Sequence, residues 1–208
     1  SDVYKRQDKA IAEGKADLVA LGRQLIADPE TVIKLERGRE EMIRPCIRCN
    51  TCISRSHFGM KPPRCAVNPV LGRELDYQYI PAPESKKKVV VAGGGPAGLE
   101  AARVLAGRGH DVILFEKSSR LGGLMWEASE AGFKTDLREY LAWSVRMTKR
   151  YTNIEVRLST RATPELIAEE KADALIIAIG AVPNIPVLTC QDRSRVMWVG
   201  DVAVSYTH

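Results

Sequence analysis

Residues 89–116 read VVVAGGGPAGLEAARVLAGRGHDVILFE, and this stretch decides the fold. A short apolar run ends in a glycine turn with the spacing GxGxxG, at Gly93, Gly95 and Gly98. In a βαβ unit these glycines allow a tight turn, let the backbone approach a pyrophosphate and let the helix pack closely on the strand. A second apolar run delivers Glu116, an acid placed to accept hydrogen bonds from ribose hydroxyls. The stretch therefore predicts a strand, turn, helix and strand that bind a dinucleotide.

Other positions near this turn are predicted to contact the same ligand. The helix begins close to Pro96, and the N–H groups and positive dipole of a helix N-terminus favour phosphates. The glycine pair in RLGGLM is a second place where backbone comes near a ligand, with a simple loop as the alternative. The predicted contacts are Gly93, Gly95, Pro96, Ala97, Gly98, Glu116, Lys117, Gly122, Gly123 and Leu124.

Composition excludes several classes of function. The 208 residues include 31 basic and 26 acidic side chains, a formal net charge of +5. The charges are interspersed and have no aromatic residues between them, which argues against nucleic-acid binding. No apolar run reaches the roughly 18 residues that a membrane span needs. The N-terminal SDVYKRQ also lacks the apolar stretch of a secretory signal. We therefore expect a cytoplasmic protein without a nucleic-acid or membrane partner.

Four of the five cysteines form a second motif. Cys46, Cys49 and Cys52 follow one another as CxxCxxC, and Cys65 comes after twelve more residues. Three thiolates at this spacing are typical of a bacterial [4Fe–4S] cluster, here with a distant fourth ligand. A zinc site usually pairs two CxxC turns, so zinc is the second reading and unligated cysteines the third. Cys190 stands apart and is predicted to be an ordinary thiol.

The segment before the cysteines predicts part of a βα unit. Residues 8–13 suggest the tail of a helix, residues 17–21 a buried strand, and residues 29–37 a further helix. Gly22 and Arg23 follow the predicted strand directly, where a backbone N–H and a guanidinium can hold a phosphate. An exposed arginine in a turn is the plainer alternative.

The rest of the chain continues the α/β pattern. Residues 77–85 contain two prolines and read as a linker between domains. A helix at 135–150, a strand at 154–158 and a short helix at 164–170 with Thr163 as its cap follow in order. The sequence ADALIIAIG then predicts a buried strand that ends at Gly180.

The order of the GR turn, CxxCxxC-x12-C, CAVNP and GGGPAGLEAA resembles the iron–sulfur flavoproteins that are built on an old yellow enzyme barrel. This NADH:flavin oxidoreductase family includes 2,4-dienoyl-CoA reductase, enoate reductase and trimethylamine dehydrogenase. The resemblance implies three parts, which are the end of an FMN-binding (β/α)8 barrel at 1–43, a [4Fe–4S] loop and linker at 44–85, and a Rossmann-like FAD domain at 86–208. A whole barrel takes about 250 residues, so a chain of 208 residues is expected to be a fragment.

The resemblance also implies further contacts and a reaction. Gly22 and Arg23 would lie on the FMN phosphate, and the strand ending in Ala178, Gly180 and Pro183 resembles a second FAD-contacting signature. The NAD(P)H-binding insert of the family follows a stretch like VMWVGDV, so it is expected to lie outside this chain, and Gly200-Asp201 comes too early for the family's later flavin motif. In the intact protein NAD(P)H would reduce FAD, and the cluster would pass electrons singly to FMN, which reduces an activated C=C bond of a small-molecule substrate.

Two alternatives remain open at this stage. An electron-transfer flavoprotein like the small subunit of glutamate synthase also joins cysteines to GGGPAG, although DLVALGR before Cys46 argues against it. A zinc-stapled module that binds a nucleotide without catalysis is the other. No catalytic residue is assigned, because the sequence shows no Ser/His/Asp set, carboxylate pair or HExxH motif. The isolated chain is predicted not to turn over substrate, because the resemblance implies that most of the barrel and the NAD(P)H-binding insert lie outside it.

Overall fold

A computed structural model describes residues 8–182, together with residues 184, 189, 192, 194, 196–199 and 202. Contacts divide the chain into two units, Ser1–Pro81 and Ala82–His208, and the division falls inside the linker predicted at 77–85. The cysteine motif belongs to the first unit and the glycine turn to the second. The predictions for Pro183, Cys190, Gly200 and Asp201 lie outside the described residues.

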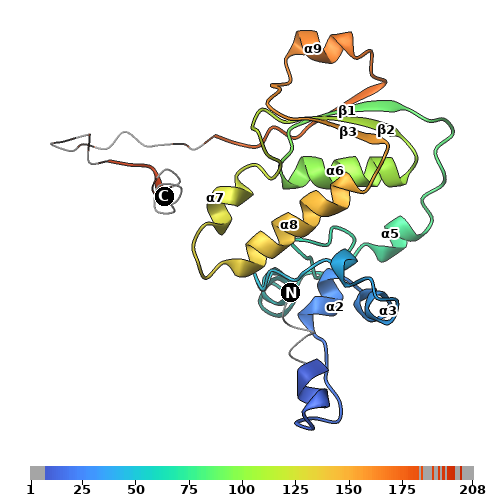
Figure 1. The fold of residues 1–208 in the computed structure, drawn as a ribbon, viewed down its shortest axis with the longest axis vertical. Coiled ribbons are helices and arrows are strands. Elements are labelled where there is room, and N and C mark those ends of the chain that lie inside the picture. Colours follow the sequence, from blue (N-terminus) through green and yellow to red (C-terminus); the bar gives the residue numbers. More distant parts are fainter. Residues whose placement is uncertain are drawn as a thin grey trace. The chain divides into compact units, whose positions relative to one another are not determined.

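The second unit is built on a four-stranded parallel sheet with the order β3-β2-β1-β4. Its strands are β1 (Lys88–Ala92), β2 (Asp111–Phe115), β3 (Ile154–Arg157) and β4 (Ala174–Ile177). Helices α6 (Pro96–Gly107), α7 (Met125–Ser129), α8 (Thr135–Lys149) and α9 (Pro164–Glu169) connect them. Figure 1 shows α6 and α8 on one face of the sheet and α9 on the other. This is the predicted Rossmann-like arrangement, in which all strands end at the same edge.

Side chains on the central strands alternate between two cores. Val91 and Leu114 pack with Leu99 and Ala102 on the side of α6, whereas Ile113 packs on the opposite side. Successive residues of a strand point to opposite faces, so a strand buried on both faces must be apolar throughout. This explains why VVVA and VILF contain no polar residue.

Most elements of this unit lie within a residue or two of their predicted bounds. The predicted N-cap of α9 is confirmed, since the Thr163 hydroxyl accepts a hydrogen bond from the Leu166 N–H. The predicted burial of the last strand is wrong. Strand β4 lies at an edge of the described sheet, and its Leu175 and Ile177 are 42% and 70% exposed. An edge strand has one neighbour instead of two, so less of its surface is covered.

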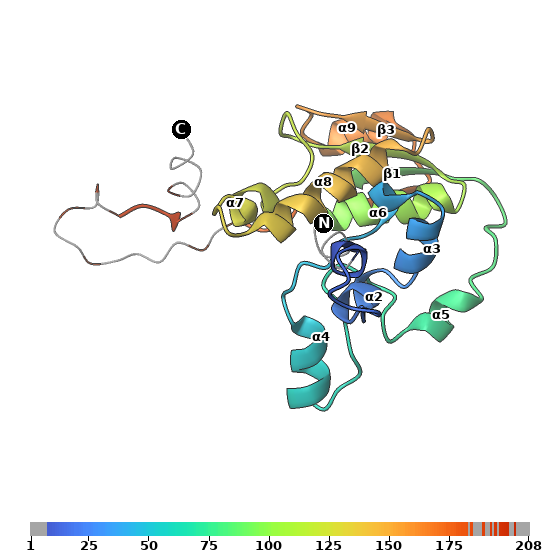
Figure 2. The same cartoon turned by 60° about the horizontal axis from the view of Figure 1, so that its bottom comes forward.

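The first unit is helical in its described part. It contains α2 (Arg23–Ala27), α3 (Thr31–Glu36), η1 (Glu40–Met42), α4 (Thr51–Ile53), η2 (Ser54–Phe58) and α5 (Glu74–Gln78). Residues 8–12 are helical as well. Figure 2 shows α4 running on into η2 as one helical arm.

The strand predicted at 17–21 is absent from the described residues, and Leu18 is 88% exposed. A strand needs a neighbouring strand to pair its backbone, and the described part of this unit contains none. Helix α2, which follows at once, was not predicted. Among the described residues, every helix is too short or too polar to cross a bilayer.

Candidate functional site

The glycine turn after β1 is built without room for side chains. Gly93 has φ +108°, and its N–H donates to the Phe115 carbonyl over 2.8 Å. A Cβ added there would lie 2.3 Å from the Ala178 carbonyl oxygen. A Cβ at Gly98 would lie 1.8 Å from the Gly93 carbonyl oxygen. Strand, turn and helix therefore meet backbone against backbone, which only glycine permits.

The second predicted glycine motif lies against the first. The Gly122 N–H donates to the Gly94 carbonyl over 2.8 Å. Gly123 has φ +53°, and a Cβ there would lie 3.1 Å from the Gly95 Cα. The structure thus joins two loops that the sequence separates by more than twenty positions, and both line the same edge of the sheet.

The N-terminus of α6 opens onto this turn. Gly95 precedes the helix as its N-cap with no side-chain cap, and Pro96 occupies the first turn. The first turn holds no acidic residue, so nothing there repels an anion. Ala97 is exposed at the same end. A twelve-residue helix with this start is suited to hold a phosphate at its N-terminus.

The Glu116 carboxylate is tied to the turn. It is 5% exposed; its Oε2 accepts from the Gly94 N–H and its Oε1 from the Ser118 N–H, each over 2.8 Å. The acid predicted to meet a ribose therefore also fixes the glycine turn. Each carboxylate oxygen has a second lone pair, so it keeps capacity for a further donor.

The remaining predicted nucleotide contacts differ in how near they lie to the turn. Ala178 continues beside β1, since its N–H donates to the Ala92 carbonyl over 2.8 Å. Gly180 has φ +75°, and among the described residues no heavy atom beyond its chain neighbours lies within 4 Å of a Cβ built there. Lys117 and Leu124 are exposed, Leu124 at 50%.

The four clustered cysteines are all free thiols with different surroundings. Cys52 is buried, Cys49 is exposed, and Cys46 and Cys65 are half-buried. Arg48 and Asn50, on either side of Cys49, have φ of 53° and 58°. Such left-handed residues curl the chain and turn successive N–H groups inward, a geometry found around anions and iron–sulfur clusters.

Burial raises the pKa of the Cys46 thiol, while the Arg48 N–H and the Arg23 charge act in the opposite direction. The nearby thiols of Cys65 and Cys49 also raise the pKa of Cys46, to a lesser degree than burial does. In the described part of the chain, no group of three or more His, Cys, Asp or Glu side chains is gathered closely enough to hold a metal ion. Four free thiols at this spacing fit the donor set of a cluster, although they have not converged on one point.

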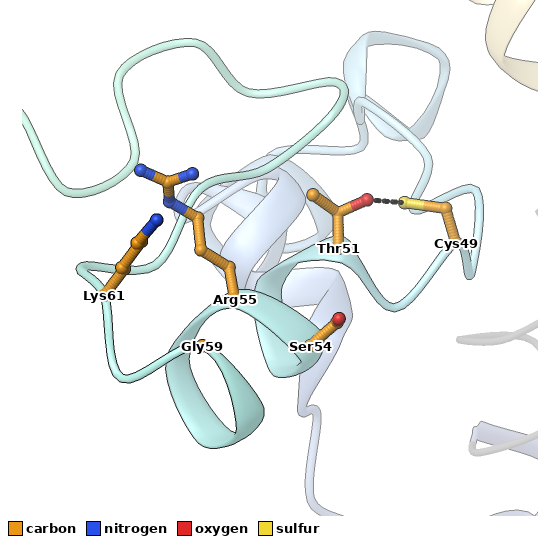
Figure 3. A pocket seen from close by; sticks show the side chains of 6 residues that line it. All are labelled: Cys49, Thr51, Ser54, Arg55, Gly59 and Lys61. Carbon is orange, nitrogen blue, oxygen red and sulfur yellow. Dashed lines mark hydrogen bonds between the residues drawn. The ribbon is translucent and has the colours of Figure 1, made fainter.

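An open hollow of about 470 Å³ lies beside Cys49 (Figure 3). The Cys49 Sγ lies 3.3 Å from the Thr51 hydroxyl. Arg55 and Lys61 line the same hollow, and the Arg55 Nε donates to the Pro62 carbonyl over 2.9 Å. Two cationic side chains therefore line the same hollow as an exposed cysteine, and the thiolate form of cysteine is the form that binds metals.

Arg23 reaches the cysteine segment. Gly22 is the N-cap of α2, and the guanidinium of Arg23 donates to the side-chain oxygen of Asn50, next to Cys49. The phosphate-binding role of this pair therefore stays a prediction, and the structure adds a contact that the sequence did not suggest.

Sequence reasoning missed three buried polar residues of the first unit, Gln24, Asp28 and Asn68, which are 5%, 4% and 7% exposed. Gln24 and Asp28 accept hydrogen bonds from backbone N–H groups of the segment that carries Cys46. Asn68, near Cys65, donates to a backbone carbonyl of α2. No local pattern marks them, because their partners lie far away in the sequence.

Residues 70–203, more than half of the chain, match the family model described as pyridine nucleotide-disulphide oxidoreductase. The chain therefore belongs to this family. Family membership and the named relatives together support a flavin and a nicotinamide nucleotide as cofactors. The resemblance to the NADH:flavin oxidoreductases related to old yellow enzyme is confirmed by the relatives below.

Two curated relatives and one solved structure illustrate the similarity. The chain is 47% identical to an NADH oxidase of Thermoanaerobacter brockii, over 86% of this chain and 28% of that protein. It is 40% identical to a cinnamate reductase of Clostridium sporogenes, over 93% of this chain and 28% of that protein. A 2-naphthoyl-CoA reductase in complex with 2-naphthoyl-CoA matches with a TM-score of 0.88 and 35% identity, over 97% of this chain and 31% of its own. The chain thus spans less than a third of these relatives.

Proposed function

We propose that this chain carries the FAD-binding and cluster-binding parts of a flavin oxidoreductase, in which electrons pass from NAD(P)H through FAD and a [4Fe–4S] cluster to FMN. The observation that carries the proposal is the pair of glycine loops that meet at the N-terminus of α6. This arrangement presents bare backbone and an uncapped helix end to a pyrophosphate. Family membership supports the same assignment.

The nucleotide contacts divide into three roles. Gly95 keeps a side chain out of the space that a pyrophosphate needs, while Gly93 and Gly123 permit the close backbone contacts that form the turn. Glu116 holds the turn through Gly94 and accepts from a ribose hydroxyl with its spare capacity. Ala178 closes the turn from the side of β4.

The proposed cluster ligands are Cys46, Cys49, Cys52 and Cys65. When these groups are bound, FAD takes a hydride and releases electrons singly, and the cluster carries one electron at a time. The arginine and lysine beside Cys49 offset the negative charge of a four-thiolate centre. Free cysteines as ligands also fit a reducing compartment, so we place the protein in the cytoplasm.

We infer that the intact protein reduces an activated C=C bond of a small molecule. Relatives that are named cinnamate reductase and 2-naphthoyl-CoA reductase support this choice. Gly22 and Arg23 would hold the FMN phosphate. The chain's own residues bind and orient cofactors in this scheme, and none of them is assigned as an acid or base.

The deciding experiment is to measure iron, acid-labile sulfide, zinc and flavin per chain on protein purified without oxygen. We expect about four irons and about four sulfides, the content of a [4Fe–4S] centre, together with FAD. One zinc without sulfide would instead indicate a structural metal site on a nucleotide-binding module. Cluster without any flavin would contradict the assignment of the glycine loops.

A further inference from the structure

Three buried polar side chains join α2 to the segments that carry Cys46 and Cys65 by hydrogen bonds. We call this set, Gln24, Asp28 and Asn68, the clamp. The Gln24 amide uses both of its N–H donors and accepts one hydrogen bond with its oxygen. Its Nε2 donates to the Arg44 carbonyl over 2.9 Å and to the Thr31 hydroxyl over 3.1 Å, and its Oε1 accepts from the Cys46 N–H over 3.1 Å. A short helix thus holds the backbone of the first cysteine directly.

Asp28 secures the same segment from the other end of α2. Its Oδ2 accepts from the Arg44 N–H over 2.8 Å, and both of its oxygens accept from the Lys34 ammonium. The carboxylate is 4% exposed, and its partners compensate its burial. Three backbone groups, which are the N–H and carbonyl of Arg44 and the N–H of Cys46, are therefore bonded to Gln24 of α2 or to its C-cap Asp28.

Asn68 connects the fourth cysteine to the same helix. Its Nδ2 donates to the Ile26 carbonyl over 2.9 Å, and its Oδ1 accepts from the Val70 N–H over 3.1 Å. The two cysteine segments also contact each other directly, because the Arg44 guanidinium donates to the Val67 carbonyl over 2.9 Å. The segments that carry Cys46 and Cys65 are thus fastened to α2 and to each other.

The two middle cysteines lie outside the clamp. Cys49 is exposed between two left-handed residues, and Cys52 stands in the three-residue α4. We propose that Gln24 and Asn68 are positioning residues, which fix the segments of Cys46 and Cys65 before a cluster is present, so that cluster assembly begins on these two cysteines. The inference rests on the proposed cluster function.

The test compares Gln24→Met with Gln78→Met. Methionine matches glutamine in length and removes every hydrogen bond of the amide, and Gln78 is an exposed residue of α5 in the same unit. Each protein is loaded with ferrous iron and sulfide without oxygen and then exposed to an iron chelator. We expect Gln24→Met to lose iron about tenfold faster than the wild type, since partners beyond the ligands commonly change metal affinity about 10–100-fold. Gln78→Met should match the wild type.

Two further readouts separate positioning from general damage. The FAD content reports on the second unit and should stay unchanged in Gln24→Met, and the paramagnetic resonance spectrum of the reduced cluster should shift because the Cys46 backbone is released. Asn68→Asp replaces the donor to the Ile26 carbonyl with a carboxylate oxygen, and it should also speed the loss of iron and leave the FAD content unchanged.

The possible failures are distinct. If the wild type takes up no iron, the proposed cluster function is wrong and the inference falls with it. If the wild type holds a cluster, and Gln24→Met releases iron at the rate of Gln78→Met with an unchanged spectrum, the clamp has no positioning role.

Discussion

The glycine loops and the cysteine segment place their ligand groups by different physical means. The loops are made of backbone, and their shape follows from where side chains are sterically excluded: a Cβ at Gly98 would lie 1.8 Å from a carbonyl oxygen. The cysteine segment presents side chains, of which two belong to segments held by buried polar groups and one is exposed. A backbone site can be complete in the protein alone, whereas a thiolate site reaches its final geometry only with its metal.

The strongest test of the backbone site is Gly98→Ala. The added methyl group would collide with the Gly93 carbonyl, so helix and strand must separate. We expect a loss of about 3 kcal/mol in the free energy of unfolding and loss of FAD binding. Chemical denaturation and flavin titration measure these effects.

Gly132→Ala is the matched control, because a Cβ there meets no heavy atom within 4 Å. Its stability and flavin binding should equal those of the wild type. A Gly98→Ala protein that behaves like this control would contradict the steric account of the turn.

The corresponding test of the thiolate site is Cys49→Ser. Loss of one of four ligands should remove nearly all iron and leave FAD content unchanged, because the two sites belong to different units. Cys190→Ser, at the fifth cysteine, should change neither quantity. If Cys49→Ser lost both cofactors together, the nucleotide domain would depend on the cluster for folding.

Glu116→Gln sharpens the comparison with a smaller change. Glutamine keeps one oxygen for a backbone N–H but turns an amide donor toward the other, so one buried hydrogen bond is lost at a cost of about 1–3 kcal/mol. We expect FAD affinity to fall about tenfold, which corresponds to about 1.4 kcal/mol. Isothermal titration of the apoprotein with FAD measures it, and an unchanged affinity would show that the carboxylate does not shape the site.

The smallest expected effect concerns pH and lies away from both sites. Hydrogen bonds from Lys88 and then Arg157 lower the pKa of Glu170 below its ordinary value of 4.5. A depressed carboxyl pKa stabilises the fold fully above the ordinary pKa, and this contribution is lost as pH falls through the lowered pKa.

The thermal midpoint of the wild type should therefore fall below about pH 4.5 more steeply than that of Glu170→Gln. The exposed neighbour Glu169 provides the control substitution, Glu169→Gln. If the thermal midpoints of wild type and Glu170→Gln fell equally steeply with pH, Glu170 would not contribute to stability in acid.

The sequence predicts the second unit well because its signals are local. Apolar runs, the proline at the start of α6 and the Thr163 cap mark the elements without knowledge of their neighbours. The prediction of a strand at 17–21 was wrong because it depends on a non-local partner: a run of apolar residues becomes a strand only beside another strand. The exposure of β4 has the same cause.

The candidate sites show the same division. Glycine spacing and cysteine spacing mark candidate ligand-binding positions from sequence alone. Gln24 could not be found in this way, because its partners Arg44 and Cys46 lie 20 and 22 positions away along the chain. Nor could the bond of Glu116 to Gly94, which depends on the turn's own geometry.

The contact between Gly93 and the Ala178 carbonyl has a consequence for biosynthesis. One wall of the nucleotide turn is supplied from a position 85 residues later, at the end of β4. Protein synthesis proceeds from the N-terminus at about 5–20 residues per second, so a nascent chain displays its glycine turn for several seconds before that wall emerges. Flavin loading is therefore expected to follow the synthesis of β4.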